Sequence, residues 1–226
     1  MFKEITNSAL VITLALLAPS AMAATDCTPS KWGAEDTLGS ANLVSPESTL
    51  NAAKLIKQGK SHALGIVIDA STPAFSPRGL SLQIVQPNQQ GGQKLDGFGY
   101  PANYNDDVLQ TWVGIGSQID GLGHLGEGGL YYNCLDEKEI SAITGLTKLG
   151  VHDIPPLVGR GVVIDMAKHA AKAMLNAGEN FGEAEIKAAA DAQGVSIGKG
   201  DVVLFHTGWT EGMLESDPTA WVSGEP

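Results

Sequence analysis

The sequence is poor in positive charge. Its 14 Lys and Arg residues stand against 25 Asp and Glu, which gives a formal net charge of -11. Nucleic acids and anionic membrane surfaces are bound by clustered Lys and Arg side chains, so this composition argues against both kinds of partner. A small-molecule ligand is compatible with such a surface, and we expect a small-molecule substrate.

Long apolar runs are also absent. The most apolar stretch is residues 9–17, which is too short for a bilayer span of roughly 20 residues. Lys3 precedes it and the small-x-small run Ala21-Met22-Ala23 follows, which is the pattern of a secretory signal peptide. We predict a signal peptide over residues 1–23 and one domain over 24–226, exported to the periplasm or secreted. A retained N-terminal anchor is the alternative.

Cysteine is scarce, since only Cys27 and Cys134 are present. In an oxidising compartment the two thiols can pair, but sequence spacing does not establish the geometry of a disulfide. A disulfide and two reduced, buried thiols therefore stay open at this point.

Two common catalytic or cofactor motifs are missing or incomplete. There is no G-x-S-x-G nucleophile elbow. Residues 121–126 match G-x-G-x-x-G, but Glu127-Gly128-Gly129 follows where a dinucleotide site needs a helix. The match therefore does not predict nucleotide binding.

The hydrophobic patterns predict strands and helices without regular βαβ alternation, which indicates an α/β fold with a mixed sheet and flanking helices. A helix should begin at Pro46 behind the capping Ser45 and stop before Gly59. A second helix is expected at 183–193 with Gly194 past its end. The expected strands are residues 63–69, 80–85, 108–113, 160–166 and 202–205. The last two are predicted to be buried. The long polar connection at 86–106 is of the kind that often has a function.

Asp120 and His124 are the strongest candidates for chemistry. They lie in a stretch dense in glycine, which allows close backbone approach to a ligand, and a carboxylate beside an imidazole suits a divalent metal with an activated water. Gln118 should point to the same side as Asp120 if the backbone is extended. A plain hydrogen bond between Asp120 and His124 in a turn is the alternative. His206 ends a predicted strand, and a structural role is favoured for it over a place in a pocket.

Five motifs, in order, resemble the metal-dependent cyclase family, which includes bacterial kynurenine formamidase and isatin hydrolase. The opening W-G-x-x-D-x-L-G-x-x-N pattern matches 32–42, and the central signature G-T-H/Q-x-D-x-x-x-H matches 116–124. The other three are Tyr131-Tyr132-Asn133, residues 159–165 and residues 200–209.

The resemblance implies a swivelling β/β/α fold, zinc or manganese, and hydrolysis of a non-peptide C–N bond, as in kynurenine-type tryptophan catabolism. It implies that Asp120 is a metal ligand, that His124 transfers protons, and that the protein is a homo-oligomer. Gly114 and Gln118 stand where the fuller family pattern has two metal-binding histidines, so the chain looks closest to a branch with the Gln form. The family also continues past residue 226, where it has a further histidine and an acidic residue, so the domain is expected to be incomplete.

We therefore expect an arylformamidase-like hydrolase with a metal held by Asp120, Gln118 and His124, for which magnesium becomes an acceptable ion because imidazole ligands are few. Two alternatives remain. One is an exported small-molecule binding protein that has lost catalysis on the same fold. The other is a fragment that does not fold stably.

Overall fold

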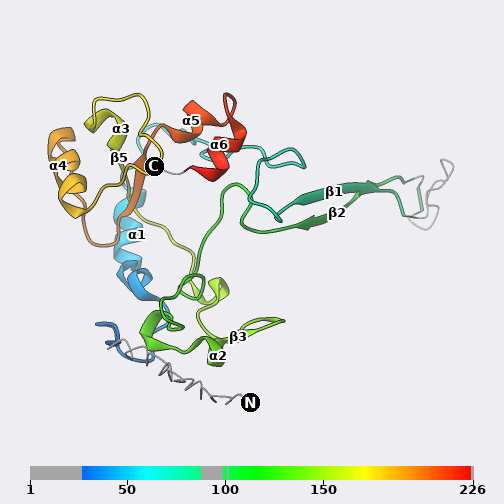
Figure 1. Cartoon of the computed structure of the whole chain (residues 1–226), viewed down its shortest axis with the longest axis horizontal. Helices are drawn as coiled ribbons and strands as arrows, with labels where there is room; N and C mark the ends of the chain where they lie inside the picture. The colour runs from blue at the N-terminus through cyan, green and yellow to red at the C-terminus, as the bar shows by residue number, and fades with distance from the viewer. Residues whose placement is uncertain (1–26, 88–98, 101, 225–226) are drawn as a thin grey trace, which may run out of the picture.

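The computed structural model describes residues 27–87, 99–100 and 102–224, and the expected signal peptide lies outside them. The mixture of helices and strands confirms the α/β class (Figure 1). The described helices are α1 (Pro46–Ala53), α2 (Glu137–Ile140), α3 (Met166–His169), α4 (Glu183–Gln193), α5 (Trp209–Met213) and α6 (Pro218–Ser223). Short 3-10 helices lie at Gly39–Leu43, Tyr132–Cys134 and Val151–Asp153. No helix within the described ranges is long and apolar enough to cross a membrane.

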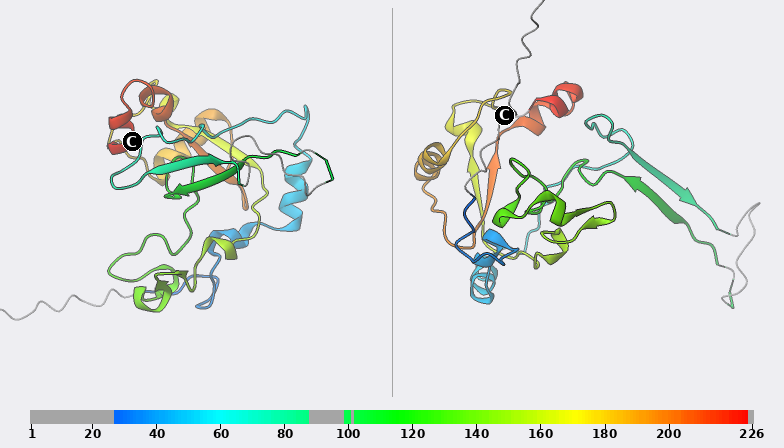
Figure 2. Two further views of the ribbon diagram at one scale, coloured as in Figure 1. Left: turned by 90° about the vertical axis from the view of Figure 1, so that its right-hand side faces the viewer. Right: turned by 60° about the horizontal axis from the view of Figure 1, so that its bottom comes forward.

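The single mixed sheet expected from the sequence is replaced, among the described residues, by three two-stranded sheets. Strands β1 (Leu80–Val85) and β2 (Asp106–Thr111) form an antiparallel hairpin, β3 (Ser141–Ala142) and β4 (Gly145–Leu146) form a second one, and β5 (Gly161–Asp165) pairs in parallel with β6 (Val202–His206). Figures 1 and 2 show the β1–β2 hairpin extending away from the rest of the chain, on the side opposite α4.

The expected strand at 63–69 does not form, and that prediction is wrong. No regular element covers this stretch, and Leu64 and Val67 are 80% and 87% exposed. A strand needs a neighbour for its backbone hydrogen bonds, and none pairs with this segment among the described residues. Apolar composition alone therefore overstated its strand character.

The two predicted helices have different outcomes. Helix α4 has the predicted bounds, and Gly194 ends it in the left-handed conformation with a φ of 68°. Helix α1 begins as predicted, with the Ser45 hydroxyl accepting from the Ser48 amide, but it ends at Ala53 instead of near Gly59. None of its residues is buried, and a short helix without a packed face has little to extend it.

The main core lies between β5 and α4. It consists of Val162, Ile164, Met166, Leu175, Ala189 and Ala190, with Phe181, Val195 and Val203 packed against it. The prediction of a buried strand holds for only one face of β5, because Val162 and Ile164 are buried whereas Val163 is 56% exposed. Strand β6 is likewise only partly buried. This alternation follows from a sheet of two strands that α4 covers on one face.

The opening motif is joined to Tyr131-Tyr132-Asn133 by polar contacts. The Tyr132 hydroxyl donates to Asp36 Oδ2 at 2.7 Å, and the Asn133 amide donates to the Asp36 carbonyl at 2.7 Å. Burial acts to raise the pKa of Asp36, but the hydrogen bonds from Tyr132, Asn42 and the Gly39 amide together outweigh it and lower that pKa. These motif residues therefore connect two distant parts of the chain.

A disulfide between Cys27 and Cys134 lies beside these contacts and settles the pairing that the sequence left open. The two cysteines are 107 residues apart in sequence.

Because a cross-link over a long loop restricts the unfolded chain strongly, we expect the double substitution Cys27→Ser/Cys134→Ser to lower the free energy of unfolding by about 4 kcal/mol. Guanidinium unfolding of the variant and of the parent chain measures this difference. Equal midpoints would contradict it, and reduced parent protein should resemble the variant.

Candidate active site

The candidate residues lie on an irregular segment after β2, from Trp112 to His124. Ile115 is 4% exposed and anchors it, and the His124 amide donates to the Gly121 carbonyl at 3.0 Å. Gly116 has a φ of +72°, and a Cβ there would lie 2.6 Å from Ile68 Cδ1. Glycine at this position therefore serves both the left-handed backbone and the packing against Ile68.

Gln118 and Asp120 point to the same side, as the alternation predicted. The Gln118 amide nitrogen donates to both carboxylate oxygens of Asp120, each at 3.0 Å. His124 Nε2 lies 3.8 Å from Asp120 Oδ1, which is an ion-pair distance and too long for a hydrogen bond. Both side chains are about half exposed, at 54% for His124 and 49% for Asp120, so the imidazole is accessible to a ligand.

Gly114 stands where the resemblance predicts the first metal-binding histidine, and the Arg78 side chain lies against it. Arg78 Nη1 donates to the Gly114 carbonyl at 3.0 Å. A Cβ at Gly114 would lie 2.6 Å from Arg78 Nη1 and 2.7 Å from Gln118 Oε1. The Arg78 guanidinium and the Gln118 amide thus occupy the space that a histidine side chain at position 114 would need. Any larger residue at 114 would have to displace them.

A cavity of about 820 Å³ brings these residues together. Its polar lining includes Arg78, Gln118, Asp120 and His124. Its apolar lining consists of Trp112, Val113, Ile119, Leu146, Leu149 and Val151. An apolar cavity with a few convergent polar groups is the usual form of a small-molecule site.

The donor set does not complete a metal site. A catalytic zinc usually keeps three protein ligands, and among the described residues no group of three or more His, Cys, Asp or Glu side chains is placed to hold an ion. Asp120 and His124 supply two donors. Gln118 turns its amide nitrogen, a hydrogen-bond donor, to the Asp120 carboxylate, so only its neutral oxygen Oε1, a weak ligand, remains as a third donor.

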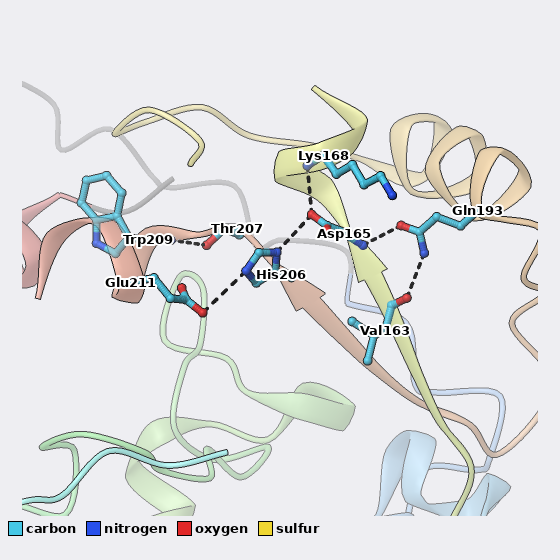
Figure 3. A network of polar contacts seen from close by, with 8 residues as sticks. All are labelled: Val163, Asp165, Lys168, Gln193, His206, Thr207, Trp209 and Glu211. Carbon is cyan, nitrogen blue, oxygen red and sulfur yellow. Dashed lines mark hydrogen bonds and ion pairs between the residues drawn. The ribbon is translucent and has the colours of Figure 1, made fainter. Parts of the chain in front are cut away.

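His206 belongs to a second polar cluster (Figure 3). The parallel pairing of β5 with β6 sets Asp165 opposite His206, and His206 Nδ1 lies 3.0 Å from Asp165 Oδ1. Its other ring nitrogen, Nε2, lies 3.6 Å from Glu211 Oε1. His206 also lines a cavity of about 360 Å³ together with Ser117 and Glu211, so it has structural partners and faces a cavity as well.

The cluster shifts the pKa values of its members in opposite directions. The hydrogen bond to Asp165 raises the pKa of His206, burial opposes this, and the charges of Asp165 and Glu211 add to it. The hydrogen bond with His206 lowers the pKa of Asp165, as does a bond from the Lys168 amide. An imidazolium–carboxylate pair is therefore favoured.

Sequence reasoning missed Arg78, Asp165 and Glu211. Asp165 ends a predicted strand beside His206, and a parallel pairing of the two strands would have placed them together. Arg78 directly follows Pro77, between two predicted strands, and belongs to no periodic pattern that would single it out. Its proximity to Gly114 is a tertiary contact between residues 36 positions apart.

Fold and site together define an α/β protein with a histidine–aspartate pair in a largely apolar cavity. A family model described as "Putative cyclase" matches residues 61–224, and the chain belongs to this cyclase family. A crystal structure described as that of a novel cyclase is similar, with a TM-score of 0.75 and 30% identity over 85% of this chain and 66% of that one. The chain thus spans just under two thirds of that relative. No curated protein matches it.

The shifted pKa values predict the pH dependence of stability. Because the pKa of His206 is raised, its contribution is complete below the ordinary histidine value of 6.5 and is lost as the pH rises through the raised value. Because the pKa of Asp165 is lowered, its contribution is complete above the ordinary value of 3.8 and is lost as the pH falls through the lowered one. The pair therefore stabilises the fold fully between these two ordinary values.

Asp165→Asn should weaken this dependence, with Glu211 left as the remaining carboxylate beside His206, at a cost of about 0.5 kcal/mol at pH 5.5, since both side chains are partly exposed and screened by solvent. Urea unfolding at a series of pH values, for the parent chain and this variant, measures the effect. Lys187→Met, on the exposed face of α4, is the control and should follow the parent profile. A variant profile parallel to that of the parent would contradict the assignment.

Proposed function

We propose that the protein is an exported hydrolase that cleaves an amide-type C–N bond in a small molecule, such as an aryl formamide or a cyclic amide. The observation that carries the proposal is the approach of His124 to Asp120, at 3.8 Å, in a cavity of about 820 Å³. Membership of the cyclase family supports an enzyme. The resemblance of the motifs to kynurenine formamidase and isatin hydrolase supports the class of bond and a place in kynurenine-type catabolism.

His124 acts as the general base and then as the general acid. It accepts a proton from water as the water oxygen bonds to the carbonyl carbon, and it delivers that proton to the nitrogen as the C–N bond breaks. The products are a carboxylic acid and an amine. Asp120, fixed by the Gln118 amide, stabilises the imidazolium formed in the first step, because opposite charges at this distance attract.

The resemblance predicts a divalent metal, zinc, manganese or magnesium, with Asp120, His124 and Gln118 as its ligands, but the donors that the described residues offer do not complete such a ligand set. When bound, such an ion would supply a polarised carbonyl and a more acidic water. The described residues offer it two strong donors, so no step of the proposed chemistry uses it.

Other parts of the proposal rest on the resemblance. They are the swivelling β/β/α arrangement, the Gln-variant branch, and export after cleavage of residues 1–23. A homo-oligomer is also expected. The exposed apolar side chains of the β1–β2 hairpin support it, since a partner would cover them: Leu82, Ile84, Val108 and Leu109.

A binding protein without catalysis is the second candidate. The observation that favours it is Gly114, where Arg78 and Gln118 lie in the place of a metal-binding histidine. It predicts ligand binding in the same cavity without turnover. Turnover assays on the purified chain therefore distinguish it from the hydrolase.

His124→Ala should lower kcat for an aryl formamide by about 10²- to 10⁴-fold, because proton transfer by a positioned side chain contributes that much. The release of the aromatic amine, followed by absorbance, measures it. The matched control is His62→Ala, since His62 is exposed and does not line this cavity. Turnover by His124→Ala at the parental rate would remove His124 from the mechanism.

Two strong donors predict weak metal binding. We expect this chain, after dialysis, to hold zinc, manganese or magnesium well below one ion per molecule by elemental analysis. The control is the Asp120→Ala variant, which should hold no less metal than the parent within error. One ion per parent chain, lost in Asp120→Ala, would instead show that Asp120 belongs to a complete ligand set.

A further inference from the structure

The chain contains two arginines, Arg78 and Arg160, and their surroundings differ. Arg160 donates from Nε to Asp201 Oδ1 at 3.0 Å and from Nη2 to Asp201 Oδ2 at 2.6 Å. The hydrogen bond to Asp201 raises the pKa of Arg160, and the same bond lowers that of Asp201, whose side chain is 8% exposed. Arg160 is thus matched by a buried carboxylate and has a structural role.

Arg78 has no such partner among the described residues. The ion pairs of these residues do not include it, although Asp120 lines the same cavity. Its contacts are the Gly114 carbonyl at 3.0 Å and the Phe75 ring, with Cζ 5.9 Å from the ring centroid. The carbonyl engages one nitrogen of the guanidinium, so its other N–H groups are available.

Arg78 is half-buried and lines two cavities. One is the cavity of about 820 Å³ that contains Asp120 and His124, and the other is a hollow of about 360 Å³ bounded by Phe75, Gln118 and Trp209. A guanidinium held in place by a backbone carbonyl beside an apolar wall is suited to bind a planar carboxylate. The chain carries a net charge of -11, so this cation gives the cavity a positive group in a protein that is otherwise strongly acidic.

Asp120 is the negative group that would oppose an anion in this cavity. Both of its oxygens accept from the Gln118 amide, and Oδ1 also lies 3.8 Å from His124 Nε2. The apolar wall beside these groups includes Trp112, Ile119 and Leu149. The cavity therefore offers a cationic anchor, an apolar surface and an acid–base pair.

We infer that Arg78 anchors a carboxylate of the ligand, so that the protein takes small amphiphilic acids with an apolar, ring-sized body. In the proposed reaction the carboxylate is a second group of the substrate, separate from the amide at His124. That role of the carboxylate in the substrate rests on the proposed function. Binding of the anion by Arg78 is independent of the proposed function, because it can be measured without turnover.

The test compares benzoate with benzamide, which have the same ring and differ in charge. By calorimetric titration of the full chain at pH 7.5, we expect benzoate to bind about tenfold more tightly than benzamide. Arg78→Met should make the two dissociation constants equal. Arg78→Lys keeps the charge but lacks the fork of the guanidinium, and it should retain only part of the preference, about threefold.

Lys187→Met removes one positive charge on the exposed face of α4 and should leave the preference unchanged. His124→Ala should also keep the benzoate preference while it loses hydrolysis, so failure of the anion site and failure of the hydrolase are separate results. Equal binding of benzoate and benzamide by the parent chain overturns the inference. The inference is also overturned if Arg78→Met keeps the full preference for benzoate over benzamide, or if Lys187→Met loses as much of that preference as Arg78→Met does. Thermal unfolding shows whether each variant is folded. If Arg78→Met does not fold, the benzoate preference of Arg78→Lys decides whether Arg78 binds the anion.

Discussion

The backbone from Gly114 to Gly123 lies so close to its neighbours that side chains are excluded from several of its positions. At Gly116 the neighbour is Ile68, and at Gly123 it is Leu146, each 2.6 Å from where a Cβ would be. The sequence suggested that this glycine density serves approach to a ligand. The structure shows that much of it serves packing against the protein itself, which holds Gln118, Asp120 and His124 at one cavity.

The same constraint changes the meaning of Gly114. The resemblance predicts a histidine at this position, and here Arg78 and Gln118 lie where its side chain would be. A metal ion and a guanidinium are both cationic, so a fixed arginine beside Gln118 disfavours a cation nearby and favours an anion. A positive group thus lies where the resemblance predicts a histidine side chain.

The second polar cluster depends on a different constraint, the parallel register of β5 and β6. That register pairs Asp165 with His206 at the ends of the two strands. Helix α5 begins directly after β6 and supplies Glu211, so the imidazole lies between two carboxylates (Figure 3). The cavity next to His206 includes Ser117, which also lines the cavity of Asp120 and His124, so the two cavities adjoin at this residue.

The sequence by itself determined the elements whose signals are local: the cap at Ser45, the helix ending at Gly194, strand β1, and the side shared by Gln118 and Asp120. The five ordered motifs also identified the family. Only the tertiary structure decided the rest. The apolar stretch at 63–69 has no partner strand within the described part of the chain, Cys27 pairs with Cys134, and Arg78 reaches Gly114 across 36 positions. Periodicity and caps act over a few residues, whereas strand pairing and cavity lining depend on contacts between distant segments, which no local pattern encodes.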